Sequence, residues 1–187
     1  VFFLRYYTVF NLEQCDGIEW QKPAVREVNE FEAIASCEAI IAGMPNRPTM
    51  TEEGGQAYYS PSRDVVNMPK RETFASAAGY YGVLFHELTH STGHASRLAR
   101  KGVDGEEKVA AFGSGDYSRE ELVAEMGASF LCGHAGIMHE TAANSAAYCA
   151  SWIKALRGDS RLIVSAAGQA QKAADYIMGV TFEEKAE

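Results

Sequence analysis

Apolar side chains recur at helical spacing in several stretches of the chain. In residues 29–42 they follow this spacing until Gly43 and Pro45 end the pattern, which predicts a helix. Residues 74–92 contain no proline and many aromatic and apolar residues, which predicts a largely buried helix that ends at Gly93. Further helices are predicted near residues 118–134, 144–156 and 160–178.

Shorter patterns predict strands and one loop. Residues 58–59 and 65–68 flank a serine- and proline-containing turn at 60–63, so an antiparallel hairpin is expected before the buried helix. Residues 6–20 mix β-branched and aromatic side chains about an Asp-Gly turn signal, as a short hairpin does. Residues 98–115 are polar and glycine-rich, and we expect them to form a mobile loop.

The composition and charge are those of a globular protein with an acidic surface. The 187 residues are 47% apolar and 22% charged, enough for one domain with a full core. The formal net charge of −8 argues against nucleic acid as the direct partner of this stretch alone, because non-specific binding to phosphates depends on Lys and Arg.

The cysteines and the start of the chain bear on location. The cysteines are far apart and form no C-x-x-C pair, so we predict reduced core residues at Cys15, Cys37, Cys132 and Cys149. The apolar opening 1–4 is interrupted by Arg5, which fits neither a signal peptide nor a membrane span and leads us to expect a cytoplasmic protein. Because the chain begins at Val1 rather than methionine, we expect it to be part of a longer one.

The segment His86-Glu87-Leu88-Thr89-His90 lies inside the predicted buried helix. Imidazoles four residues apart rise about 6 Å along one face of a helix, so both can reach one ion. Zinc is the expected metal, because it favours imidazole nitrogens, and a catalytic zinc needs a third protein ligand and an open position for water. Glu87 is then the candidate general base for that water.

The third ligand has several candidates. His94 continues the spacing, but a straight helix carries it about 12 Å from His86, too far to share an ion. Glu121 and Glu125 share one face of the following helix. Glu121 is the favoured ligand, with a capping box with Ser118 as the alternative. Glu125, one turn further on, fits a carboxylate that orients an imidazole.

Other polar residues near the motif have weaker claims to a role. Tyr117 enters the helix of Glu121 and is a candidate to stabilise an oxyanion, although a tyrosine there more often only packs. Arg97 could bind a substrate carboxylate, but a pairing with the glutamate-rich helix is favoured. His134 and His139 are interpreted as structural or exposed residues.

Many of these residues match a known family. The specific matches surround the motif: Tyr59-Ser60-Pro61, Asp64, Met68-Pro69, Phe74, Tyr80-Tyr81, residues 86–94, Arg97-Leu98, Tyr117 and residues 120–125. Weaker matches lie towards the ends: residues 7–11, Gln14, Ala147-Tyr148, Trp152, Leu156 and residues 170–173. Together they resemble the zincin-like metallopeptidase domain of ArdC-type antirestriction proteins, which plasmids, conjugative elements and phages carry.

The resemblance implies a fold, a metal and a domain boundary. The implied fold is a mainly helical α+β zincin with a small antiparallel sheet, with Zn²⁺ held by His86, His90 and Glu121. Residues 1–20 would be the end of an N-terminal domain that binds single-stranded DNA, or an edge hairpin, and residues 21–187 the zincin-like domain. In related zincins a turn Glu-x-x-Ala-Asx holds the third ligand at its first position. The corresponding residues here, 121–125, end in Glu125 instead of Asp or Asn, which leaves Glu125 as a rival ligand.

Two classes of function follow from these observations. The first is a cytoplasmic zinc peptidase of the gluzincin type, with Glu87 and Tyr117 as catalytic residues, a protein or peptide as substrate and no membrane partner. The second is an acidic binding module that inhibits restriction enzymes, or a DNA-binding protein, in which zinc is only structural. A catalytic zinc keeps a water, whereas a structural zinc is closed by four protein ligands.

Overall fold

The computed structural model describes residues 8, 15, 17, 30–100, 103, 115–139, 141 and 161–180, and at 30–34 and 115–118 it describes only the helical backbone. The helix predicted at 144–156 lies outside these residues, as do most of the hairpin predicted at 6–20 and of the loop predicted at 98–115. The domain boundary predicted after residue 20 also falls there.

The predicted helices are confirmed wherever the chain is described. They are α1 (Glu30–Gly43), α2 (Ala77–Ser91), α3 (Gly115–Ala135) and α5 (Arg161–Ile177). Residues 71–73 form a separate short 3₁₀ helix, η2 (Arg71–Thr73). The start of α2 is later than predicted because Phe74 is extended and the hydroxyl of Ser76 caps the helix by accepting a hydrogen bond from the Gly79 amide at 3.0 Å. No helix in this described part combines the length and apolar character that a membrane span requires.

The sheet is small and mixed. Its strands are β1 (Thr49–Thr51), β2 (Tyr58–Ser60) and β3 (Val65–Asn67), in the order β1-β3-β2. The predicted antiparallel hairpin is confirmed, with Tyr59 opposite Val66 in the β2–β3 pair. The prediction of a wholly antiparallel sheet is wrong, because β1 pairs in parallel with β3 and brings Met50 opposite Val66.

A buried asparagine fixes the connection between β1 and β2. Asn67, only 1% exposed, donates from its amide nitrogen to the carbonyls of Glu53 and Gln56 at 2.8 and 2.7 Å. Its side-chain oxygen accepts from the Thr51 hydroxyl and the Glu53 amide, both at 2.9 Å. All the polar atoms of its side chain are therefore bonded, which offsets the cost of burying them and holds the segment between β1 and β2 against β3.

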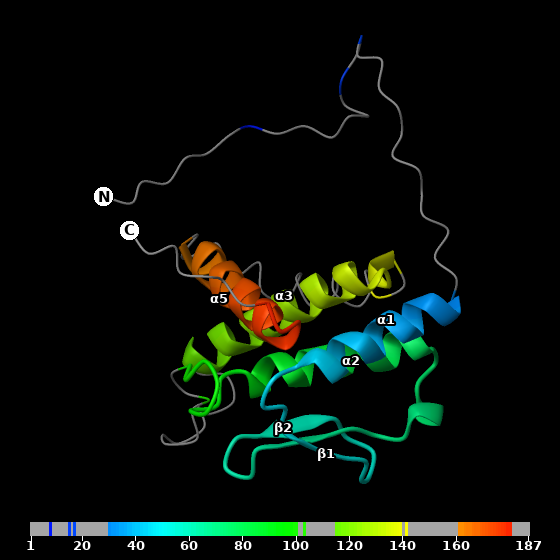
Figure 1. Cartoon of the computed structure of the whole chain (residues 1–187). Coiled ribbons are helices and arrows are strands. Elements are labelled where there is room, and N and C mark those ends of the chain that lie inside the picture. Colours follow the sequence, from blue (N-terminus) through cyan, green and yellow to red (C-terminus); the bar gives the residue numbers. More distant parts are fainter. Residues whose placement is uncertain are drawn as a thin grey trace.

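Helix α2 is the centre of the core. It packs against α3 on one side and against β2 and β3 on the other, with α5 beyond α3 (Figure 1). The largest buried apolar side chains come from all these layers: Val66, Met68, Tyr81, Leu84, Phe85, Leu88, Val123, Leu131 and Ile177. The α+β class is thus confirmed, and α2, which carries the histidine motif, cannot move without disturbing its neighbours.

The cysteine prediction is confirmed for the two buried thiols. Cys37 and Cys132 form no disulfide, and burial raises their thiol pKa values to about 12 and about 11, so both stay protonated. Cys15 is half-buried and also unbridged, whereas Cys149 lies outside the described residues.

Helices α2 and α3 approach closely at Gly127. A Cβ atom there would lie 2.6 Å from Cγ2 of Thr89, a buried residue whose hydroxyl donates to the Phe85 carbonyl at 2.7 Å. We expect Gly127→Ala to lower the free energy of unfolding by about 1–3 kcal/mol, because the added methyl group overpacks this contact. The measurement is urea denaturation followed by circular dichroism.

Gly168 in α5 provides the matched control for this prediction. A Cβ atom at Gly168 meets nothing within 4 Å, so Gly168→Ala should leave the packing intact and stabilise α5 by about 0.5–1 kcal/mol through helix propensity. Equal effects of the two alanine substitutions would contradict a special role for the close contact at Gly127.

Candidate metal centre

The two histidines of the motif project from one face of α2. The Nε2 atoms of His86 and His90 are 3.1 Å apart, and the rings meet nearly at right angles, with centroids separated by 4.7 Å. The side chains are 15% and 13% exposed. The four-residue spacing thus directs both nitrogens at one point that solvent can still reach.

Glu121, on α3, supplies the third donor of this group. Its carboxylate oxygens lie 3.7 Å from Nε2 of His86 and 3.4 Å from Nε2 of His90. Donor atoms about 2 Å from a tetrahedral zinc ion are about 3.3 Å from one another, so these separations fit a single ion. In the described chain, His86, His90 and Glu121 form the group able to hold a metal.

The start of α3 excludes the capping alternative for Glu121. Because α3 begins at Gly115, Ser118 lies inside the helix and not at its N-cap, so the proposed capping box is wrong. The helix thereby places Glu120, Glu121 and Glu125 beside α2. The side chain of Tyr117 lies outside what the structure describes, and its suggested role stays a prediction.

Two further carboxylates contact the other nitrogens of the imidazole rings. Oε1 of Glu125 is 3.2 Å from Nδ1 of His86, as expected for a carboxylate that orients a ligand. Oε1 of Glu120 is likewise 3.2 Å from Nδ1 of His90. Such contacts favour a proton on Nδ1 and leave Nε2 available to a metal. Sequence reasoning gave Glu120 no role, although it adjoins Glu121.

Arg100 holds Glu120 in place from the segment after α2. Its guanidinium donates to both oxygens of Glu120, from Nε at 3.0 Å and from Nη2 at 2.5 Å, and also to the Thr89 carbonyl at 2.8 Å. Burial raises the pKa of Glu120, but hydrogen bonds from His90 and Arg100 outweigh it, so the pKa is lowered and the carboxylate stays charged. No motif or spacing in the sequence indicates this role of Arg100.

The carboxylates also favour a proton on the second histidine when no ion competes for it. Burial lowers the pKa of His90, but hydrogen bonds to Glu120 and Glu121 overcome it and raise the pKa to about 10. The centre is therefore built to stabilise positive charge between the two helices. A divalent ion supplies such charge once the proton has left.

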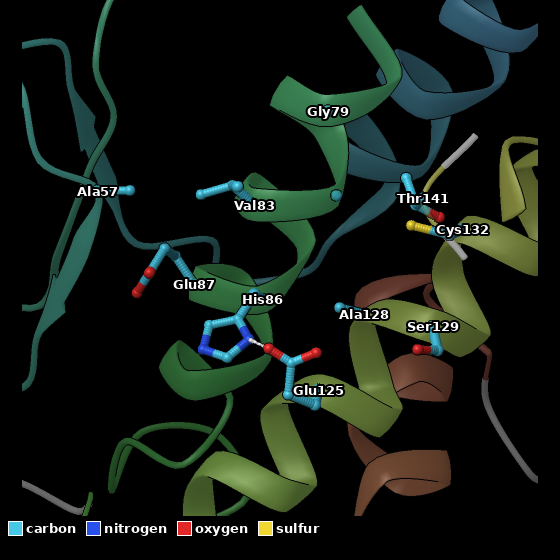
Figure 2. Close-up of a pocket in the computed structure, with 11 residues that line it drawn as sticks. Ala57, Gly79, Val83, His86, Glu87, Glu125, Ala128, Ser129, Cys132 and Thr141 are labelled. Carbon is cyan, nitrogen blue, oxygen red and sulfur yellow. Dashed lines mark ion pairs between the residues drawn. The ribbon is translucent and has the colours of Figure 1, made fainter. Parts of the chain in front are cut away.

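Glu87 extends to the opposite side of His86 from Glu125 (Figure 2). It is only 9% exposed, and desolvation raises its pKa although the two histidines and a backbone hydrogen bond from Tyr59 act in the other direction. A carboxylate with a raised pKa close to the candidate ligands is suited to accept and return a proton.

Arg97 pairs with the hairpin that precedes α2. Its buried guanidinium pairs with both oxygens of Asp64, and the distance from Nη1 to Oδ2 is 3.0 Å. The Tyr59 hydroxyl also donates a hydrogen bond to Asp64, at 2.9 Å. Burial raises the pKa of Asp64, but Arg97 and Tyr59 outweigh it and lower the pKa. The predicted contact of Arg97 with the glutamate-rich helix is wrong; Arg97 instead ties the end of α2 to the hairpin, next to the backbone that contacts Glu87.

The remaining histidines lie apart from this centre. Nδ1 of His94 is 2.8 Å from the hydroxyl of Ser96 and accepts from the Ser96 amide at 3.2 Å, because the chain turns after Thr92. His134 and His139 are both exposed, as expected. None of these three belongs to the group of metal-binding donors in the described residues.

The fold and this group of side chains agree with a known class of protein. A family model described as zincin-like metallopeptidase matches residues 35–169, and the chain belongs to this family. It is also similar to the antirestriction protein ArdC of plasmid R388. The Mn(II)-bound crystal structure of ArdC is 39% identical with a TM-score of 0.63, and the metal-free one is 37% identical with a TM-score of 0.58. The predicted resemblance to ArdC-type proteins is confirmed.

The chain matches only part of each of its relatives. The match with each ArdC structure includes 91% of this chain. It covers 60% of the Mn(II)-bound ArdC chain and 58% of the metal-free one. It is 38% identical to the uncharacterised protein y4eC of Sinorhizobium fredii over 175 residues, which are 94% of this chain and 54% of that protein. It is 39% identical to a DNA primase TraC of Escherichia coli over 178 residues, which are 95% of this chain and 16% of the primase.

Proposed function

We propose that this chain is a zinc-dependent peptidase domain of the gluzincin type, acting on a protein or peptide. The observation that carries the proposal is the spacing of 3.1 to 3.7 Å between Nε2 of His86, Nε2 of His90 and the oxygens of Glu121. Three protein donors leave one tetrahedral position for water or substrate, as catalytic zinc requires and structural zinc does not.

Zinc is the metal that we propose for this site. Two imidazole nitrogens and one carboxylate form a donor set found in zinc peptidases, whereas manganese favours oxygen-rich sets. When bound, the ion acts as a Lewis acid that polarises the substrate carbonyl and makes water more acidic. Because ArdC of R388 was crystallised with Mn(II), the relative affinity of this chain for the two ions is the first quantity to measure.

Each step of hydrolysis that involves a proton is assigned to a residue of this chain. Glu87 accepts a proton from the attacking water as its oxygen bonds to the carbonyl carbon. Glu87 then returns a proton to the nitrogen as the C–N bond breaks. Tyr117, whose backbone lies in the first turn of α3, is proposed to donate a hydrogen bond to the carbonyl oxygen as its charge develops.

The third ligand can be tested by comparing neighbouring glutamates. Glu121→Ala is expected to weaken zinc binding more than Glu125→Ala or Glu120→Ala, because a lost metal bond exceeds the loss of an orienting carboxylate, which is about 10- to 100-fold. The measurement is competition with a chromogenic chelator. A larger effect of Glu125→Ala would make Glu125 the ligand and contradict this assignment.

The peptidase activity can be tested without knowledge of the natural substrate. The zinc-loaded protein is incubated with a mixture of unfolded proteins, and new amino termini are identified by mass spectrometry. Removal of zinc by a chelator should abolish the cleavage, and added zinc should restore it. If the zinc-loaded protein produces no new termini, the proposal of a general peptidase is wrong.

We place this activity in the cytoplasm, in an antirestriction system of a mobile element. The similarity to ArdC supports this setting. Because the chain spans only part of its longer relatives, binding of single-stranded DNA is assigned to a portion outside the zincin-like domain, of which residues 1–20 would be the end. Protection of DNA in cells must accordingly be tested in a full-length protein.

A second candidate function is an acidic binding module that engages a restriction enzyme in place of DNA. The net charge of −8 favours it, since such a surface resembles the charge of nucleic acid. In that case the metal would only stabilise the fold. The two functions differ in their need for Glu87, whose carboxylate is required for proton transfer and not for holding the ion.

A further inference from the structure

Tyr59, the middle residue of β2, is bonded at both of its ends. Its backbone N–H donates a hydrogen bond to Glu87, and its phenol hydroxyl donates to Asp64 at 2.9 Å. Because β2 is an outer strand of the described sheet, an amide on its outer side needs a partner from elsewhere in the fold. Glu87 is that partner, and Figure 2 shows it projecting from α2 on the side of Ala57, which directly precedes β2.

The phenol end of Tyr59 is anchored to a buried ion pair. The Arg97 side chain is fully buried and pairs with both oxygens of Asp64, and its Nη2 also donates to the Tyr59 hydroxyl at 3.3 Å. Burial and the hydrogen bond to Asp64 raise the pKa of Tyr59, so the hydroxyl keeps its proton and stays a donor. Hydrogen bonds to charged groups are strong and directional, so the ring is held in one place.

Arg97 connects this anchor to the helix that carries Glu87. Its Nε donates to the carbonyl of Ser91, the last residue of α2, at 2.7 Å, and its Nη1 donates to the carbonyl of Asn46 at 3.0 Å. Because one planar guanidinium makes all these bonds, it fixes the hairpin and the end of α2 relative to each other. Glu87 lies one turn before Ser91 on the same helix, so the hydrogen bond from the Tyr59 backbone depends on this arrangement.

The direction of the Glu87 carboxylate matters for its proposed role. It stands at the end of a side chain with several rotatable bonds, and holding such a side chain in one conformation costs entropy. A general base must lie within hydrogen-bond reach of the proton that it accepts, and a misplacement of about 1 Å can lower a rate by about 10²-fold. A fixed backbone N–H from the neighbouring strand is suited to hold the carboxylate in one direction.

We infer that Arg97, Asp64 and the phenol of Tyr59 are positioning residues for Glu87, because they hold β2 against α2 so that the Tyr59 N–H directs the carboxylate of the base. This inference rests on the proposed peptidase function. It adds residues that are neither metal ligands nor carriers of the transferred proton.

The first test measures hydrogen exchange of the residue-59 amide by nuclear magnetic resonance in the zinc-loaded chain. Tyr59→Phe removes only the hydroxyl and should make this amide exchange about 5-fold faster, the effect of one net hydrogen bond. Exchange of the Val66 amide on β3 and the affinity for zinc should stay unchanged. Tyr58→Phe is the matched control, because Tyr58 is 39% exposed and its side chain points to the other face of β2.

The second test measures the kinetics of peptide cleavage. Tyr59→Phe should lower kcat about 5- to 10-fold and leave KM unchanged, because the base and not the binding of substrate is disturbed. Arg97→Lys keeps the charge but cannot form the planar fork, so it should act in the same direction. The double variant should be no slower than the slower single variant, since both changes act through the same amide.

Several results would overturn the inference. One is unchanged exchange at residue 59 in Tyr59→Phe. Another is equal acceleration at residue 59 and at Val66, which would mean that the phenol only stabilises the sheet. If the change at residue 59 is found alone but the wild-type chain cleaves no peptide, the positioning contact stands and the peptidase proposal fails. If Tyr59→Phe cleaves peptides with the wild-type kcat, the peptidase proposal stands and the positioning role fails.

Discussion

Glu87→Gln is expected to retain zinc and to hydrolyse peptide bonds at least ~10²-fold more slowly than the wild-type chain. The amide has nearly the same shape as the carboxylate but cannot accept a proton from water. Glu87 is 9% exposed, and its burial raises its pKa, so glutamine also relieves a desolvated charge and should not destabilise the fold. The rate is measured on a peptide taken from the cleavage mapping.

Exposed Glu52 supplies the matched control for this experiment. Glu52→Gln makes the same chemical change away from the candidate centre and should leave both zinc content and the rate unchanged. Hydrolysis by Glu87→Gln at the wild-type rate would refute the role of Glu87 as the base.

The same substitution connects the chemistry with the biology when it is made in a full-length relative of the chain. Loss of protection against restriction, with zinc and fold intact, would tie that protection to proteolysis. Full protection by Glu87→Gln would instead favour the acidic module or a DNA-binding activity.

The double substitution His86→Ala/His90→Ala is expected to abolish stoichiometric zinc binding. It removes two of the three donors whose mutual distances are 3.1 to 3.7 Å, and Glu121 alone retains a single bond. The wild-type chain should contain about one zinc per molecule and the variant almost none, measured by mass spectrometry of the metal after dialysis. His134→Ala/His139→Ala removes two exposed imidazoles and should keep the zinc.

A stoichiometric ion in the doubly substituted His86 and His90 variant would place the metal elsewhere. Loss of zinc from the His134 and His139 control would have the same meaning, because those side chains do not contact the proposed centre. Either result would remove the basis for the peptidase proposal.

Local sequence signals were sufficient for the elements that carry the centre. The spacing of apolar residues predicts α1, α2, α3 and α5, and the four-residue spacing of His86 and His90 brings their nitrogens together once α2 forms. Strand β1 was not predicted, since three residues that follow Pro48 carry too little pattern, and their parallel pairing with β3 depends on the tertiary fold.

The long-range polar pairs could not be predicted from spacing. Arg97 pairs with Asp64, 33 residues away on the hairpin, and Arg100 pairs with Glu120, 20 residues away on another helix. Helical periodicity relates only residues three or four apart, so it offers no reason to prefer these partners. Glu120 was overlooked for the same reason, because its contact with Nδ1 of His90 depends on how α3 crosses α2.

The donors of the centre belong to two helices, which gives a bound ion a second consequence. An ion held by His90 and Glu121 would act as a non-covalent cross-link that closes the segment between α2 and α3. Binding to the folded state alone contributes about 4 kcal/mol when the free ion is at 1,000 times its dissociation constant. The lifetime of the folded domain, and its resistance to proteases, would therefore follow the supply of metal in the cell that contains it.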